Sequence, residues 1–189
     1  MPRAGLSTGV VVEEAARLVD DVGYDRLTLA GLAKRFGVAL PSLYKHVDGL
    51  DDLHRRLAVR VAHELGDAMR RAATGKATAA AVRSVAAAYR DYAHRHPGRY
   101  AYVVRAPSSE DAEHLAAATE ILDVLYDVFA GYGITDEEAV DAARFARSTL
   151  HGFVSLEVGG GFGMPRSVDR SFERLVDALD HALAGWSVP

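Results

Sequence analysis

Residues 28–47, TLAGLAKRFGVALPSLYKHV, decide the fold of the N-terminal part of this chain. Their first half repeats apolar side chains three and four positions apart, which is the spacing of one buried helical face. These side chains are Leu29, Leu32, Ala33 and Phe36. Thr28 stands where a side-chain oxygen caps a helix, and Gly37 stands where a left-handed residue ends one. The pattern therefore predicts a short helix that ends in a tight turn.

A second helix is expected directly after this turn. Pro41 suits its first turn, because the N–H that proline lacks has no helical partner there. Leu43 and Val47 return an apolar face to the first helix, and the small Ala33 lets the two helices cross closely. The side chains left on the outer face are Leu40, Ser42, Lys45 and His46. Such a pair is typical of proteins that place the second helix in the major groove of DNA.

The charge of this stretch supports the same interpretation. The 189-residue chain carries a formal net charge of −4, yet residues 26–47 contain only basic charges. These are Arg26, Lys34, Arg35 and Lys45. A local basic surface favours contact with phosphate, although a charged run is in other cases only a solvated face. Because the helix spacing, the turn glycine and the lack of acids coincide, we favour DNA binding.

Composition excludes several other classes of protein. The chain has no cysteine, which rules out disulfides and thiolate metal sites. No metal site is expected, because His94 and His96 have no third ligand nearby. No cofactor is expected either, since the glycine run at 159–163 lacks the lysine and hydroxyl residue of a phosphate-binding loop. Neither an apolar stretch of about 20 residues nor a signal peptide is found, so a cytoplasmic protein without membrane contact is expected.

The rest of the chain is also predicted to be helical. Turn-forming residues separate five further segments with helical periodicity, at about 76–95, 98–105, 110–130, 135–158 and 167–184. Ser109 is a candidate cap, and Thr135 with Glu138 has the spacing of a capping box. No stretch alternates with the period of two that strands require. We therefore predict an all-α fold of about nine helices.

Residues 10–65 resemble the N-terminal domain of the tetracycline-repressor-like (TetR) family of bacterial transcription regulators. The resemblance lies in VVEEAARLVDDVGYDRLTL at 11–29, LAKRFGV at 32–38 and SLYKHVDGLDDL at 42–53. In the last of these, the residues that follow the family pattern are Leu43, Tyr44, His46 and Val47. The resemblance implies a helix-turn-helix domain at 1–55, whose last helix continues to about residue 72 as a connector.

Two positions depart from the family pattern. Ala39 stands where serine is common, and the loss of such a cap typically costs about 1 kcal/mol. Leu50 stands where a lysine is common, so one phosphate contact is expected to be absent. Both departures bear on the affinity for DNA more than on the class of protein.

The resemblance also implies which side chains contact DNA. Those expected to face bases or the groove floor are Leu40, Pro41, Ser42 and Lys45. Those expected to lie near phosphates are Thr28, Tyr44 and His46. The chemistry agrees, since lysine donates to guanine O6 and N7, serine serves either base type, and apolar groups pack on a thymine methyl. Tyr44 has an alternative interpretation as a core aromatic, and His46 as a capping or packed residue.

A second resemblance covers RSTLHGFVSLEVGGGFG at 147–163, which is similar to the His-Gly signature of one C-terminal-domain subgroup of the family. It implies a regulatory and dimerisation domain at 73–189, in which the last two long helices form a homodimer. A dimer suits a palindromic operator, because two recognition helices about 34–36 Å apart reach successive major grooves. The alternative is that both helices pack inside one subunit.

The family further implies that an unknown small-molecule effector binds among the central helices. Candidate lining residues are Tyr89, Tyr92, Tyr126, Phe129, Phe145 and His151. Aromatic side chains with a polar tip line many ligand pockets, although aromatics at helical spacing are often plain core. We therefore predict a sequence-specific transcription regulator, a repressor that a ligand releases, and no enzyme. The alternatives are an activator, and a helical ligand-binding protein or enzyme that keeps the helix-turn-helix as a scaffold.

Overall fold

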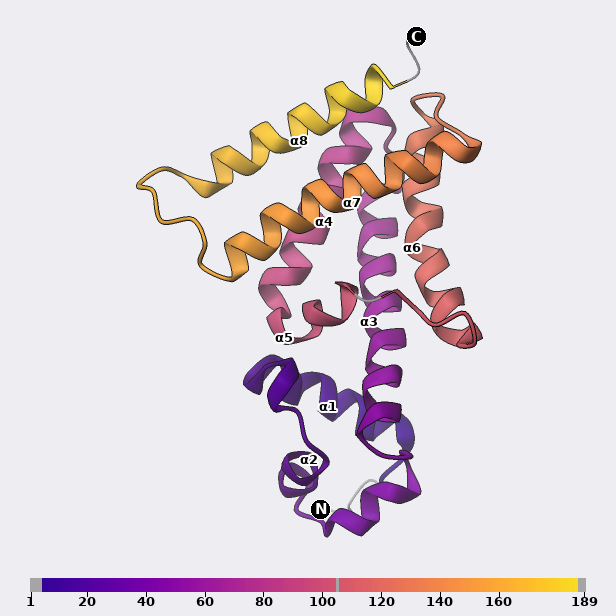
Figure 1. Ribbon diagram of the computed structural model, residues 1–189, viewed down its shortest axis with the longest axis vertical. Helices are drawn as coiled ribbons and strands as arrows, with labels where there is room; N and C mark the ends of the chain where they lie inside the picture. Colours follow the sequence, from indigo (N-terminus) through magenta and orange to yellow (C-terminus); the bar gives the residue numbers. More distant parts are fainter. Residues whose placement is uncertain (1–4, 105, 187–189) are drawn as a thin grey trace. The chain divides into compact units, whose positions relative to one another are not determined.

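The computed structural model describes residues 5–104 and 106–186, and these residues are arranged as helices joined by short connections (Figure 1). Within this part of the chain there are eight α-helices, three short 3-10 helices and no strand. The prediction was about nine helices. The described residues contain nine when η2 is counted as a helix, η3 is counted as the continuation of α5, and the single turn η1 is left out. The all-α fold is confirmed. The predicted helix end at 105 and the outermost predicted domain residues, 1–4 and 187–189, lie outside the described residues.

The chain divides into two compact units, which we describe separately. The first comprises the residues up to Ala62 together with His96–Leu115. Its helices are α1 (Thr8–Val22), η1 (Tyr24–Arg26), α2 (Leu29–Phe36), η2 (Leu40–Lys45), the first part of α3 (Leu50–Ala73), α5 (Pro97–Tyr100) and η3 (Ala101–Val104). Its core is apolar, with almost completely buried leucines from α2, η2, α3 and the connection between η1 and α2. These are Leu27, Leu32, Leu43, Leu53 and Leu57.

The second unit contains the remainder of α3, α4 (Thr78–Arg95), most of α6 (Ala112–Ala130), α7 (Asp136–Val158) and α8 (Val168–Ala184). Helices α4, α7 and α8 pack against one another. The largest fully buried side chains of this unit are Leu65, Met69, Phe129, Ile134 and Leu183. No helix in residues 5–104 and 106–186 combines the length and the apolar character needed to cross a bilayer.

The predicted turn between α2 and the next helix is present in detail. Thr28 Oγ1 accepts a hydrogen bond of 3.0 Å from the Gly31 N–H, which caps α2. Gly37 has φ 66° and ψ 34°, a left-handed conformation that glycine adopts without a Cβ penalty. The Val38 N–H donates to the Ala33 carbonyl and the Gly37 N–H to that of Lys34, both at 3.1 Å. This is a Schellman motif, and it turns the chain into η2.

The second helix of the pair differs from a regular α-helix, because η2 is a 3-10 helix of 6 residues. Its N-cap residue, Ala39, makes no side-chain capping bond, and Pro41 contributes no N–H. The Ser42 N–H instead donates to the Ala39 carbonyl at 2.9 Å, the shorter bond of a 3-10 turn. The departure from the family pattern at Ala39 therefore has a local structural counterpart.

Two predicted caps are wrong. Thr135 is the N-cap residue of α7, but its side chain makes no capping bond and donates to Asp136 at 2.9 Å. Glu138 accepts from the Trp186 indole at 2.8 Å, a partner that is distant in sequence. At α6 the capping side chain belongs to Asp111, which accepts from the His114 N–H at 3.1 Å, and not to Ser109.

Candidate nucleic-acid interface

The helix η2 has one buried face and one open face. Leu43 and, just after the helix, Val47 are completely buried. Pro41, Tyr44 and Lys45 are exposed, and the half-buried members of the predicted set are Leu40, Ser42 and His46. Tyr44 is 54% exposed, so it is not part of the core. The helix therefore offers a mixed surface of apolar, hydroxyl and cationic groups, which is the chemistry that base edges and phosphates accept.

The basic surface is narrower than the sequence suggests. Arg35 forms ion pairs with Glu14 and Asp21 of α1, so its charge is already neutralised. The Arg26 side chain donates to the Val22 carbonyl at 2.6 Å. Only Lys34 and Lys45, among the four basic residues of this stretch, have no ion pair or hydrogen bond within the described residues. Both lysines are exposed, so within residues 26–47 they are the two basic side chains left without an ion pair or hydrogen bond in the described residues.

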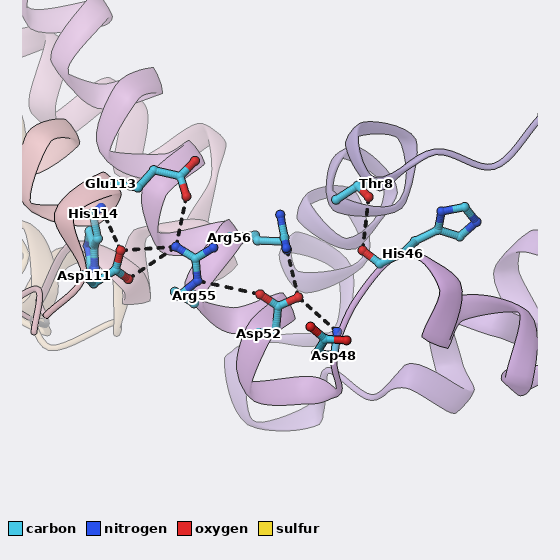
Figure 2. Close-up of polar contacts among 9 residues, drawn as sticks. All are labelled: Thr8, His46, Asp48, Asp52, Arg55, Arg56, Asp111, Glu113 and His114. Carbon is cyan, nitrogen blue, oxygen red and sulfur yellow. Dashed lines mark hydrogen bonds and ion pairs between the residues drawn. The ribbon is translucent and has the colours of Figure 1, made fainter.

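A contact that sequence reasoning missed fixes the end of η2. The Thr8 hydroxyl donates to the His46 carbonyl at 3.1 Å, and Figure 2 shows the His46 imidazole directed away from this bond. Thr8 opens α1, while Ser7 caps that helix by accepting from the Val10 N–H. Two consecutive hydroxyl residues are typical of a helix start, but nothing in the sequence indicates a partner 38 residues away.

The turn that follows η2 is held by a carboxylate from α3. Asp52 Oδ2 accepts from the Asp48 N–H at 3.1 Å and pairs with Arg56 Nε at 2.8 Å (Figure 2). Partial burial opposes the charge of Asp52, yet the hydrogen bonds from Arg56 and the Asp48 backbone outweigh it and hold its pKa below the ordinary value. Asp52 thus stays ionised and fixes the direction in which α3 leaves η2.

The predicted effector residues lie in different environments of the second unit. Tyr89, Tyr92 and Phe129 are buried, and the Tyr92 hydroxyl donates to Glu64 at 2.9 Å. The other three are more accessible. Tyr126 and His151 are half-buried, and Phe145 is exposed but contacts Trp186 in a tilted arrangement with ring centroids 5.5 Å apart.

Each unit also carries a groove, and neither groove is lined by any of these six residues. The groove of the first unit has a volume of about 700 Å³ and is bordered by Tyr24, His54, Arg55 and Tyr102. The groove of the second has a volume of about 1070 Å³ and lies along α4 and α8, beside Arg90 and Phe172. Both volumes are large enough for a small molecule.

The two helices around Gly37 and the exposed face of η2 define a helix-turn-helix DNA-binding protein. Comparison with known proteins gives its family. Residues 11–55 match the family model described as bacterial regulatory proteins, tetR family. Residues 82–179 match the one described as the tetracyclin repressor-like C-terminal domain.

Two curated relatives extend this match. An uncharacterized HTH-type transcriptional regulator of Mycobacterium tuberculosis is 42% identical over 158 residues, which are 83% of this chain and 72% of that protein. Another from Bacillus subtilis is 34% identical over 82% of this chain and 81% of its own length. The chain belongs to the tetR family of bacterial regulatory proteins, and it is a DNA-binding transcription regulator.

Solved structures share the fold. A protein of unknown function from Rhodococcus sp. RHA1 superposes with a TM-score of 0.79 at 25% identity, over 97% of this chain and 99% of that one. BioQ in complex with its double-stranded DNA operator gives 0.62 at 24% identity, over 93% and 99%. A TetR variant from Acinetobacter baumannii in complex with minocycline gives 0.74 at 19% identity, over 98% and 100%. The resemblance of 147–163 to the His-Gly subgroup stays a prediction.

Proposed function

We propose that this regulator is a homodimeric repressor that binds a palindromic operator and is released by a small-molecule effector. The observation that carries the proposal is the open face of η2, on which Lys45 has no partner within the described residues and Leu43 anchors the opposite face in the core. The solved complexes of BioQ with its operator and of TetR with minocycline lend support from proteins of the same fold. We propose no enzymatic activity.

The proposed DNA contacts follow from exposure and chemistry. We propose that Lys45 and Ser42 donate to base edges, and that Leu40 with Pro41 packs on a thymine methyl. Tyr44 and His46 lie at the same end of η2 and are proposed to contact phosphate. Thr28 is proposed to do so from the start of α2, where its hydroxyl hydrogen is still free to donate while its oxygen caps the helix.

The dimer is supported by the outer face of α7. Phe145 and Leu156 are 36% and 54% exposed, and a Cβ added at Gly152 would meet no atom within 4 Å. A helix that leaves large apolar side chains and a glycine open is suited to close packing against another helix. A second copy of the chain is the proposed partner, because it would pair two η2 helices for a palindrome.

The proposed effector contacts are the six candidate lining residues Tyr89, Tyr92, Tyr126, Phe129, Phe145 and His151.

The function is tested by selecting bound duplexes from a random DNA pool and titrating the recovered duplex at two salt concentrations. Lys45→Ala is expected to weaken binding roughly tenfold or more, as the loss of a base contact does. Lys76→Ala removes the same charge from an exposed site in the second unit, where the lysine bonds to Ala72 and Ser84, and is expected to leave affinity unchanged. Recovery of no duplex above background, or equal effects of both variants, would contradict the proposal.

A further inference from the structure

We infer that Arg55 couples the first turn of α6 to the turn that follows η2, so that operator binding and the state of α6 influence each other through one guanidinium group. The inference rests on the proposed function, since it names residues that would carry its regulation. Arg55 contacts three carboxylates of the first unit, Asp52, Asp111 and Glu113. Figure 2 shows Arg55 between Asp52 on one side and Asp111 with Glu113 on the other.

The first link joins Arg55 to the end of the DNA-binding helices. Arg55 Nε lies 3.7 Å from Asp52 Oδ1, while the other oxygen of this carboxylate accepts from the Asp48 N–H at 3.1 Å. Asp48 follows η2 after only two residues, and the second of these, Val47, is buried. A force on the Asp52 carboxylate therefore reaches the backbone that positions η2.

The second link joins Arg55 to α6. Arg55 Nη1 donates to Asp111 at 3.2 Å and to Glu113 at 3.0 Å. Asp111 is also the residue that caps α6, through the bond from the His114 N–H. That backbone bond, together with Arg55, lowers the pKa of Asp111 although partial burial opposes the charge. One carboxylate thus holds both the guanidinium and the first turn of α6.

We link this bridge to regulation because α6 belongs to both units. Its first residues, up to Leu115, belong to the first unit, and the rest of the helix belongs to the second. A change that shifts or frays the start of α6 must break or carry with it the bonds of Arg55. Thermodynamic reciprocity then requires operator binding to stabilise the same turn.

Arg56 is a matched control for Arg55. It is the next residue of α3, its side chain is equally accessible at 34% against 35%, and it binds the same Asp52 carboxylate at 2.8 Å. No contact joins Arg56 to Asp111 or Glu113 in the described residues. Removal of Arg56 therefore disturbs Asp52 without breaking the bridge to α6.

The first experiment measures backbone hydrogen exchange in the full chain with and without the duplex recovered above. In the wild-type protein the duplex is expected to slow exchange of the His114 amide about two- to fivefold, the range that a partly exposed ion pair can transmit. The slowing is expected to persist in Arg56→Gln and to vanish in Arg55→Gln. Equal slowing in both variants, or none in the wild-type protein, overturns the inference.

The second experiment needs no DNA, so it tests the link between the turn after η2 and the first turn of α6 even if no duplex is recovered and the proposed function fails. Asp111→Asn removes the charge of the carboxylate that both binds Arg55 and caps α6, but keeps a side chain that caps helices well. It is expected to speed exchange of the Asp48 amide about two- to fivefold when Arg55 is present, and to have no effect in the Arg55→Gln background. Equal effects in both backgrounds, or none in either, overturn the inference. If Arg55→Gln fails to fold by circular dichroism, Arg55→Lys replaces it, because lysine lacks the separate Nε and Nη1 groups with which Arg55 contacts Asp52 and Asp111.

Discussion

At the scale of single residues, the contact between Gly98 and the end of α1 depends on the absence of one methyl group. A Cβ built on Gly98 would lie 1.9 Å from the Val19 carbonyl oxygen and 2.8 Å from the Asp20 Cα. The Asp20 carboxylate accepts from the Arg99 N–H at 2.9 Å and pairs with its Nε at 2.8 Å. His96 Nδ1 lies 3.2 Å from the same carboxylate. The close backbone contact of Gly98 and the bonds of the Asp20 carboxylate therefore hold α5 against the end of α1.

Gly98→Ala is expected to lower the free energy of unfolding by about 1–3 kcal/mol or more, because the added methyl meets backbone that cannot move aside. Urea unfolding followed by circular dichroism measures the change. Gly9→Ala in α1 is the control, since a Cβ there meets no atom within 4 Å. The control is expected to raise stability by up to about 1 kcal/mol through helix propensity. A Gly98→Ala variant as stable as the wild-type protein would show that α5 is not held against α1.

At the scale of elements, η2 illustrates how a cap selects between two helix types. The N3 amide of this helix belongs to Ser42, and with alanine at the cap it bonds to the Ala39 carbonyl. A serine at the cap offers a side-chain oxygen to the same amide, which frees the backbone for α-helical geometry. The sequence predicted the position and the faces of this helix, because apolar spacing is local. The sequence did not predict the 3-10 form. We attribute this form to the Ser42 N–H, which bonds to the Ala39 carbonyl because no side chain at residue 39 accepts from it.

Ala39→Ser is expected to raise the free energy of unfolding by about 1 kcal/mol, through the added N-cap bond. The transition midpoint in urea measures the gain. Ala87→Ser makes the same chemical change at an exposed position inside α4, where serine is a poorer helix former. It is expected to lower stability by about 0.5 kcal/mol. Equal effects at both positions would mean that η2 takes no N-cap.

At the scale of the whole molecule, the two units have separate apolar cores, and each contributes to a proposed activity. The first carries η2, and the second carries the exposed face of α7. Association of two chains through α7 would therefore bring two copies of the first unit into one molecule. A dimer of standard size buries about 800 Å² on each partner, so a single large side chain at its centre is disruptive.

Gly152→Arg is expected to convert a dimer of about twice 20.3 kDa into a monomer, because arginine fills the open space beside α7. Sedimentation equilibrium measures the mass, and circular dichroism checks that the fold is kept. The monomer is then expected to bind the recovered duplex much more weakly, since one chain contacts only one half of the palindrome. A wild-type protein that sediments as a monomer at binding concentrations would contradict the proposed dimer.

The pH dependence of stability is also expected to reflect the second unit. Burial, reinforced by the charge of Arg147, lowers the pKa of His151 from 6.5. Below pH 6.5 the unfolded chain therefore binds a proton that the folded chain resists, so stability falls as pH falls through this value. Urea unfolding at pH 7.5 and pH 5.5 is expected to show a smaller difference for His151→Gln than for the wild-type protein. An unchanged difference would show that His151 is freely solvated.

Local sequence patterns by themselves determined the helices, the cap at Thr28, the left-handed turn at Gly37 and the buried and open faces of η2, because each depends on residues within a few positions of one another. Only the tertiary structure decided that Arg35 forms ion pairs with α1 and that Thr8 donates to the His46 carbonyl. It likewise decided that Glu138, predicted for a capping box, accepts from the Trp186 indole. The Arg55 bridge to Asp111 belongs to the same group. In each case the partner lies far away in the sequence, and the pairing exists only because the folded helices bring both side chains together.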